Sequence, residues 1–160
     1  MGVQIPSFTC LAVPDGALFD RVTAIAQAAE RSGFDSLWVM DRVYQIATVG
    51  PPTDPMPEAY TLLGALAART ERARLGTMVT GVTYRNPTLL ATIITTLDVI
   101  SGGRAILGIG AAWNEDGRRG YGFDFPPSRE RLDRPCSTRS SRASPAATTG
   151  SSRPSTSRDR

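Results

Sequence analysis

The residues from Arg74 to Gly110, RLGTMVTGVTYRNPTLLATIITTLDVISGGRAILGIG, decide the fold class. The apolar runs at 75–79 and 105–109 predict two short strands. Between them, Asn86-Pro87 fits the N-cap and first position of a helix, and Gly102-Gly103 fits its end. The stretch therefore predicts one strand–helix–strand unit with parallel strands.

The residues before Arg74 repeat this alternation. Short apolar runs at 3–5 and 36–40 predict two further strands, and apolar side chains at helical spacing predict helices at 18–32 and 58–70. Strict alternation of four strands with three helices indicates an α/β fold with a parallel sheet. This pattern fits both an open doubly wound sheet and half of a (β/α)8 barrel.

The helix predicted after Asn86 is expected to pack an apolar side against the sheet. It should bury six residues: Leu89, Leu90, Ile93, Ile94, Leu97 and Ile100. A loop is expected at 114–128, and a fourth helix is predicted to begin at Arg129.

Polar or glycine-rich residues follow three predicted strands at their carboxyl ends. They are Asp41, Thr80-Gly81 and Gly110-Ala111. Each alone fits an ordinary turn, but the carboxyl ends of parallel strands meet at one edge, which is where barrels of this class place their active sites. The loop at 41–57, with four prolines, follows the second strand and has a length typical of functional loops. We therefore predict a ligand site at this edge.

Gly108 and Gly110 also resemble the start of a dinucleotide-binding glycine motif. Trp113 stands where the third glycine belongs, however, and no strong helix pattern follows. We therefore interpret the two glycines as a strand end at which the backbone approaches a neighbour or a ligand.

The composition excludes several function classes. Of the 160 residues, 41% are hydrophobic and 21% are charged, which is typical of a soluble globular protein. There is no histidine, which excludes Ser-His and Cys-His catalysis and a histidine-ligated metal site. Cys10 and Cys136 form no ligand motif and are interpreted as separate thiols. We expect a cytoplasmic protein without a signal peptide, a membrane span or a metal.

Residues 135–160 differ from the rest of the chain. They contain eight Ser, five Arg, four Thr and three Pro, without a Leu, Ile, Val, Met or aromatic residue, and are expected to be disordered. They carry a net charge of +4, so residues 1–134 carry −1 of the chain's +3, and nucleic-acid binding by the folded part is not expected. The composition of residues 135–160 has two further interpretations. One is an Arg/Ser tail that binds nucleic acid. The other is the hypothesis that these residues are an out-of-frame translation of a GC-rich gene.

Several of these segments together resemble the luciferase-like monooxygenase family, and most closely its coenzyme F420-dependent oxidoreductase branch. They are GFDSLWVMD, EAYTLLGALAARTERARLGTMVTGVTYRNPTLLA, TLDVISGGRAILGIGAAWN, YGFDFPP and RLDR, and the resemblance runs from Gly2 to Arg134. Members of the family are (β/α)8 barrels of roughly twice this length. The resemblance implies that residues 1–134 are the N-terminal half of such a TIM-type barrel, about four βα units, and that 135–160 lie outside it.

The resemblance also implies a function. Members bind F420 or a flavin such as FMN at the carboxyl edge and transfer hydride between it and a small organic substrate or NADPH. By position, the cofactor-binding residues are Val79, Thr80, Gly81, Val82, Gly110, Ala111 and Asn114, and the candidate catalytic residues are Asp41 and Arg42. The segment 79–82 resembles the family's bulge behind the cofactor ring, which often contains a non-proline cis peptide.

The sequence departs from the family pattern in three ways. Arg42 replaces the usual histidine, and its permanent charge prevents proton shuttling but would stabilise an anionic reduced deazaflavin. The acidic residue that some members carry near Ala111 is absent. The second half of the barrel is also missing, which leaves two unpaired sheet edges. These edges predict self-association, and the alternatives to an active enzyme are an inactive fragment or a half-barrel that needs a partner chain.

Overall fold

The computed structural model describes residues 1–9, 14, 16–111, 115, 120, 122, 127 and 129–130. The predictions for Asn114, for the two cysteines and for residues 135–160 concern positions outside this set. Of the helix predicted from Arg129, the structure describes Arg129 and Glu130, and both are helical.

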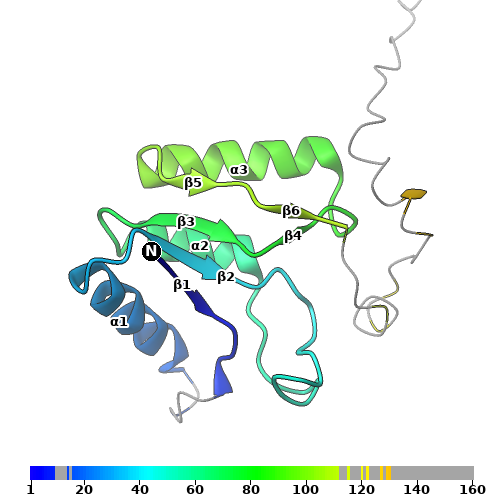
Figure 1. Ribbon diagram of the computed structural model, residues 1–160, viewed down its shortest axis with the longest axis horizontal. Coiled ribbons are helices and arrows are strands. Elements are labelled where there is room, and N and C mark those ends of the chain that lie inside the picture. The colour runs from blue at the N-terminus through cyan, green and yellow to red at the C-terminus, as the bar shows by residue number, and fades with distance from the viewer. Residues whose placement is uncertain are drawn as a thin grey trace, which may run out of the picture.

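The described strands form two parallel groups. A four-stranded sheet has the order β1 (Gly2–Ile5), β2 (Ser36–Val39), β3 (Arg74–Thr77) and β5 (Ala105–Ile106), while β4 (Thr80–Gly81) pairs with β6 (Ile109–Gly110). The helices α1 (Leu18–Arg31), α2 (Ala59–Ala67) and α3 (Pro87–Ser101) alternate with the strands along the chain. Figure 1 shows the strands pointing toward one end of the molecule, so their carboxyl ends share one edge.

The strand order distinguishes between the two architectures that the sequence allowed. Neighbouring strands in the sheet are consecutive βα units, and every pairing is parallel. A doubly wound sheet reverses its winding direction at a switch point, whereas a barrel winds in one direction throughout. The described sheet winds in one direction (Figure 1), as half of a barrel does.

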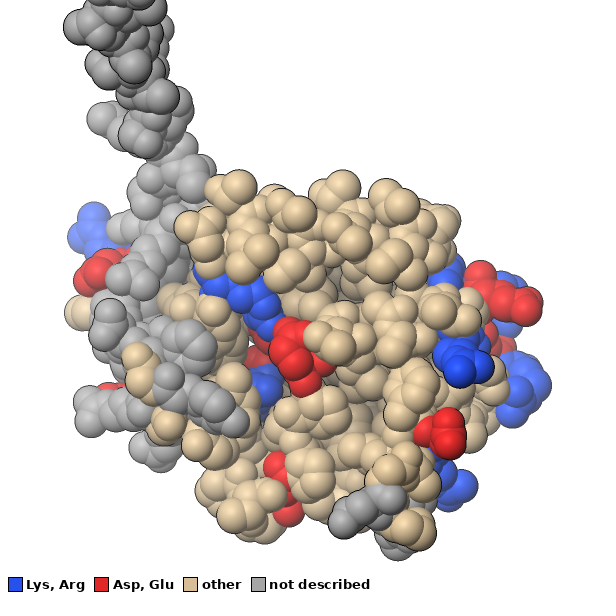
Figure 2. Space-filling view, turned by 180° about the vertical axis from the view of Figure 1, so that it is seen from behind, with Lys and Arg blue, Asp and Glu red and all other residues tan. Residues whose placement is uncertain are grey.

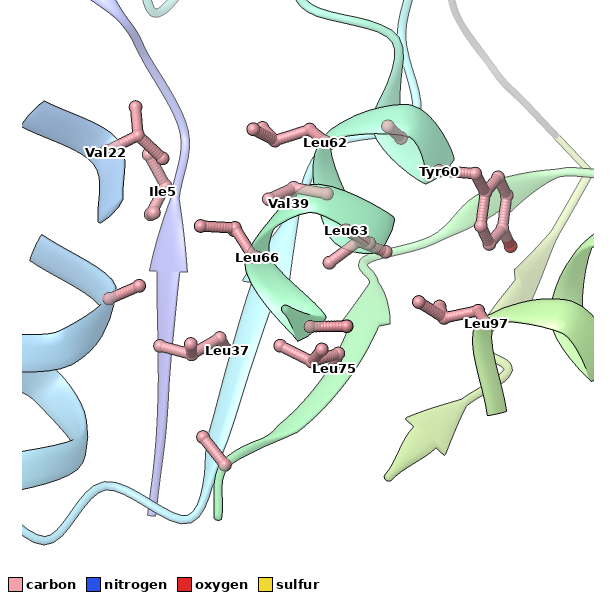
Figure 3. Close-up of a cluster of buried hydrophobic side chains, with 14 of the residues drawn as sticks. Ile5, Val22, Leu37, Val39, Tyr60, Leu62, Leu63, Leu66, Leu75 and Leu97 are labelled. Atoms are coloured by element: carbon pink, nitrogen blue, oxygen red, sulfur yellow. The ribbon is translucent and has the colours of Figure 1, made fainter. Parts of the chain in front are cut away.

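The main core lies between the sheet and the helices. Leu37 and Val39 of β2 and Leu75 of β3 are at most 1% exposed, and they belong to one cluster with Leu63 and Leu66 of α2 (Figure 3). Complete burial of such a side chain contributes about 1.5–3 kcal/mol to folding. Leu37, Val39 and Leu75 are the residues through which β2 and β3 contribute to this core.

The other face of the sheet is occupied largely by Trp38. This residue alternates with Leu37 and Val39 along β2, so its side chain points away from the helices. Its indole Nε1 donates a hydrogen bond to Ser36 Oγ at 2.9 Å. A Cβ atom added to Gly2 or Gly76 would lie only 2.7 or 2.8 Å from the indole ring. Glycine on both neighbouring strands thus makes room for this ring.

The ends of α3 agree with the sequence prediction. Asn86 Oδ1 accepts hydrogen bonds from the backbone N–H groups of Thr88 at 2.9 Å and Leu89 at 3.4 Å, and Pro87 occupies the first turn. Gly102 ends the helix in the left-handed conformation, with a φ of 68°. This local chemistry explains why the helix bounds could be predicted closely.

The buried side of α3 was predicted too broadly. Leu90 and Leu97 are buried, but Leu89 and Ile100 are 52% and 53% exposed. The helix contacts α2 and β5, so part of its apolar surface stays uncovered. In the rear view of Figure 2, uncharged side chains cover the top of the molecule, where α3 lies. The prediction that all six apolar residues are buried is therefore wrong.

The predicted strand 75–79 is interrupted. β3 ends at Thr77, a cis peptide bond joins Met78 to Val79, and β4 begins at Thr80. The Met78 N–H still donates to Val39 O at 2.9 Å, whereas the Thr80 N–H donates to Gly108 O at 2.7 Å. The chain therefore changes neighbours at this point, and we call residues 78–79 the bulge.

The prediction of a helix over 58–70 is also too long, since α2 spans Ala59–Ala67. Its first turn is capped by the Glu58 carboxylate, which accepts a hydrogen bond from the Thr61 N–H at 2.7 Å.

Among the described residues, no helix has both the length and the hydropathy needed to cross a membrane.

Candidate functional site

The bulge and β6 lie in contact at the carboxyl edge of the sheet. β4 pairs with β6 in the register Thr80 with Ile109 and Gly81 with Gly110. A Cβ atom added to Gly110 would lie 2.2 Å from Cγ2 of Val79. Glycine is thus required at position 110, because the Val79 side chain occupies the space that a larger residue would need.

Exposed apolar residues lie next to this contact along the chain. Met78 and Val79 of the bulge are 48% and 46% exposed, while Leu107 before β6 and Ile109 within it are 43% and 53% exposed. Gly108 brings its backbone close to β3, since an added Cβ would lie 2.8 Å from Thr77 O. An apolar surface with closely approaching backbone fits one side of a flat aromatic ring system such as a flavin or deazaflavin.

Asp41 connects the end of β2 to β4. The residue is 7% exposed, and its Oδ2 accepts a hydrogen bond from the Gly81 N–H at 3.0 Å. Both carboxylate oxygens also accept from Arg85, Oδ2 from Nη1 at 2.7 Å and Oδ1 from Nη2 at 2.8 Å. The structure therefore brings the predicted residues Asp41 and Gly81 together, with Arg85 as their shared neighbour.

Arg85 is a residue that the sequence analysis missed. Its guanidinium also binds Glu58 and lies 4.9 Å above the ring centre of Tyr60. We call Asp41, Glu58, Tyr60 and Arg85 the Arg85 network. Burial lowers the pKa of Arg85, but the Asp41 and Glu58 carboxylates outweigh burial and raise that pKa above its ordinary value. The Arg85 guanidinium therefore stays charged.

A chain of hydroxyl groups extends the network beneath the bulge. The Tyr60 hydroxyl is hydrogen-bonded to Thr80 Oγ1, which is hydrogen-bonded to Thr77 Oγ1. Thr77 and Thr80 are completely buried. Burial raises the pKa of Tyr60, so its hydroxyl remains neutral at physiological pH. These two hydrogen bonds hold the side chain of Thr80 in place.

Arg42 lies at a different surface. It lines a groove of about 750 Å³ between α2 and α3, together with Asp41, Arg85 and the apolar residues Leu89 and Ile93. Burial holds the pKa of Arg42 below its ordinary value, but an arginine remains charged near neutral pH. None of the predicted cofactor-binding residues lines this groove.

Three further residues were predicted to bind the cofactor: Val82, Ala111 and Asn114. The Val82 N–H donates to Gly110 O at 3.2 Å, which continues the contact between β4 and β6. Ala111 follows β6 directly, and Asn114 lies outside the described residues. Within the part of the chain that the structure describes, no three acidic or thiol side chains gather as metal ligands would.

Comparison with known proteins finds a matching family and relatives of similar sequence. A family model described as "Luciferase-like monooxygenase" matches residues 2–133. An F420-dependent glucose-6-phosphate dehydrogenase from Kineococcus radiotolerans is 38% identical over 117 residues, which are 71% of this chain and 33% of that protein. A 5,10-methylenetetrahydromethanopterin reductase from Methanolobus tindarius is 37% identical over 90 residues, covering 56% of this chain and 24% of that protein.

Solved structures agree at the level of the fold. The oxygenating constituent of 3,6-diketocamphane monooxygenase from Pseudomonas putida, in complex with FMN, matches 84% of this chain and 36% of its own, with a TM-score of 0.68 and 23% identity. The coenzyme F420-dependent tetrahydromethanopterin reductase from Methanopyrus kandleri matches 78% of this chain and 30% of its own, with a TM-score of 0.58 and 26% identity. The chain thus spans about a third of the length of these relatives.

Proposed function

Because this chain belongs to the luciferase-like monooxygenase family, we propose that its carboxyl edge binds coenzyme F420, with FMN as the alternative. The bound cofactor would supply the hydride acceptor or donor, and a small organic substrate or NADPH would be the reaction partner. The observation that carries this proposal is the exposed apolar bulge, Met78-Val79, in which Val79 packs against Gly108 and Gly110.

The names of the relatives support the choice of cofactor. The glucose-6-phosphate dehydrogenase from Kineococcus radiotolerans and the reductase from Methanopyrus kandleri are both F420-dependent. The diketocamphane monooxygenase structure contains FMN. F420 is placed first because the curated relatives of this chain include several F420-dependent glucose-6-phosphate dehydrogenases that are 34–38% identical to it.

In the proposed complex, the bulge supports the cofactor ring through Val79. Gly108 and Gly110 allow their backbone to lie close to Thr77 and to the Val79 side chain, while Thr80, Gly81 and Val82 hold the bulge in position. Ala111 and Asn114 complete the proposed ring-lining segment. Arg42 lines the groove between α2 and α3 and not the surface formed by these residues, so we propose no contact between its charge and the cofactor ring.

The chain covers about a third of the length of these relatives, and we propose that the whole catalytic cycle uses further strands of the barrel. We propose residues 1–134 as the barrel portion and 135–160 as a separate tail. The first and last strands of the described sheet, β1 and β5, each have a neighbour on one side only. This observation favours a second candidate function, in which the chain is half of a barrel and becomes active with a partner that supplies the remaining strands.

Cofactor titration of two matched valine variants tests the proposal. Val79 and Val99 are both exposed, at 46% and 77%, but Val79 belongs to the bulge and Val99 to α3. The 160-residue chain, Val79→Asp and Val99→Asp would each be titrated with F420 and with FMN, following cofactor fluorescence and thermal stability. We expect saturable binding that raises the melting temperature of the parent and of Val99→Asp, and its loss in Val79→Asp.

Either of two results would contradict the proposal. One is the absence of binding of either cofactor to a parent chain that melts cooperatively. The other is undiminished binding by a folded Val79→Asp variant, which would place the cofactor away from the bulge. Preference between F420 and FMN follows from the ratio of the two dissociation constants.

A further inference from the structure

We propose that Arg85 is a positioning residue, which acts through Asp41 and Tyr60 to fix the backbone of β4 beneath the cofactor. This inference rests on the proposed function and extends it, because Arg85 was not among the residues that the sequence places at the site. It assigns the guanidinium a role in shaping the cofactor platform, a name that we use for β4 and the bulge together.

The Arg85 guanidinium is largely buried, and it interacts with the side chains of Asp41, Glu58 and Tyr60. Its side chain is 13% exposed, and that of Asp41 is 4% exposed. Two parallel N–H···O bonds join it to Asp41, a third bond joins it to Glu58, and its guanidinium stacks over Tyr60. A bidentate arginine–carboxylate pair fixes both distance and direction, which a single bond cannot do.

The first connection to the platform runs through Asp41. Oδ2 of Asp41 accepts from Arg85 Nη1 and from the Gly81 N–H at the same time. If the guanidinium is removed, the buried carboxylate loses two hydrogen bonds and its compensating charge, so we expect it to turn toward water. The acceptor of the Gly81 N–H then moves.

The second connection runs through Tyr60. The Arg85 guanidinium covers its ring, and its hydroxyl binds Thr80 Oγ1. Thr80 and Gly81 are the whole of β4, and this two-residue strand pairs with β6 through two residues only. Since so short a ladder gives little rigidity by itself, the contacts to Asp41 and Tyr60 determine where the bulge lies.

Arg104 provides a matched control elsewhere in the fold. Its guanidinium also engages several acceptors: the carbonyl oxygens of Ala67, Thr70, Ala73 and Ser101, and the hydroxyl of Thr70. These residues lie after α2, before β3 and at the end of α3, away from the carboxyl edge. Loss of Arg104 should therefore reduce stability without reshaping the platform.

The experiment compares Arg85→Gln, Arg85→Lys and Arg104→Gln in the full 160-residue chain. The readouts are F420 and FMN dissociation constants, the spectrum of the bound cofactor, and the amide hydrogen exchange of Gly81. We expect Arg85→Gln to weaken cofactor binding and to speed Gly81 exchange, each by about tenfold or more. Arg85→Lys, which keeps the charge but loses the bidentate pair, should recover part of both effects.

Arg104→Gln should lower the melting temperature while the folded fraction keeps the parent dissociation constant and spectrum. The proposal is overturned if folded Arg85→Gln keeps the parent values for cofactor binding and for Gly81 exchange. If Arg85→Gln does not fold, the same comparison is made between Arg85→Lys and Arg104→Lys. If the parent chain binds neither cofactor, the proposed function fails, and the Gly81 exchange rates still decide whether Arg85 positions β4.

Discussion

Asp41 illustrates how a residue can be located from sequence while its role depends on a distant partner. Its place after a buried strand predicted that it would lie at the carboxyl edge, and the structure puts it there with 7% exposure. Arg85 was missed because it stands 44 residues further along the chain, in a segment that looked like the start of a helix. A buried carboxylate needs a compensating cation, and Arg85 in the predicted unit at 74–110 supplies one.

Also at the residue scale, the contact between Val79 and Gly110 makes a prediction about stability. Gly110→Ala places a Cβ atom 2.2 Å from Cγ2 of Val79, whose branched side chain cannot easily turn away. We expect a loss of about 1–3 kcal/mol in the free energy of unfolding. Urea denaturation measures this loss.

A double mutant and a control make this prediction specific. Val79→Ala removes the obstructing methyl groups, so the double variant should recover most of the stability lost by Gly110→Ala alone. Gly64→Ala, in α2, meets no atom within 4 Å and should stabilise the protein by about 0.5–1 kcal/mol. Additive losses in the double variant would show that the steric explanation is wrong.

Among the secondary-structure elements, helices were predicted better than strands. The cap of α3 by Asn86 and its end at Gly102 are local signals, and both were read correctly. The resemblance predicted a bulge at 79–82, but apolar spacing alone extended the strand to 79, because the chain changes neighbours where the Thr80 N–H donates to Gly108 O, 28 residues away. The exposure of Leu89 and Ile100 was missed for a similar reason, since apolar spacing does not tell how much of a helix its neighbours cover.

The junction between α1 and β3 gives a prediction about pH. Glu30 is 8% exposed and accepts hydrogen bonds from the backbone N–H groups of Glu71, Arg72 and Ala73. Burial alone would raise the pKa of Glu30, but these bonds outweigh it and hold that pKa below the ordinary value of 4.5. Because the folded-state pKa is lowered, the stabilisation is complete above pH 4.5 and is lost as the pH falls through the folded-state value.

Melting temperatures measured from neutral pH down into the acid range test this effect. The Glu30→Gln variant cannot ionise, so its stability should fall less steeply below pH 4.5 than that of the parent. Glu71→Gln is the control, because the backbone N–H of residue 71, and not its carboxylate, takes part in the junction. Parallel curves for the parent and Glu30→Gln would refute the assignment.

At the scale of the whole molecule, the described sheet is open on both sides. β1 and β5 pair with one neighbour each, and apolar side chains on α3 remain exposed. The family resemblance predicted the barrel-type order of the strands, and the pattern of elements predicted most residues of the carboxyl edge. The sequence did not indicate which surfaces of the sheet and of α3 remain uncovered. The family and the barrel-type fold are confirmed by the comparisons.

The open edges predict that the chain associates with itself. Sedimentation velocity should show a sedimentation coefficient that rises with protein concentration. The association should persist at high salt, because backbone hydrogen bonds and apolar contacts are less screened than surface charges. A variant that ends at residue 134 should behave in the same way. Association that disappears with salt or with removal of 135–160 would instead assign it to the basic tail.

The position of Trp38 has a consequence for any protein that completes the barrel. Its indole already fills the space above Gly2 and Gly76, on the side of the sheet that faces away from the helices. Interiors pack at nearly constant density, so a large side chain on one half must be matched by small ones on the other. A complementary half taken from a relative should therefore be chosen by the volume of its inward-facing side chains, with alanine, serine or glycine opposite the indole.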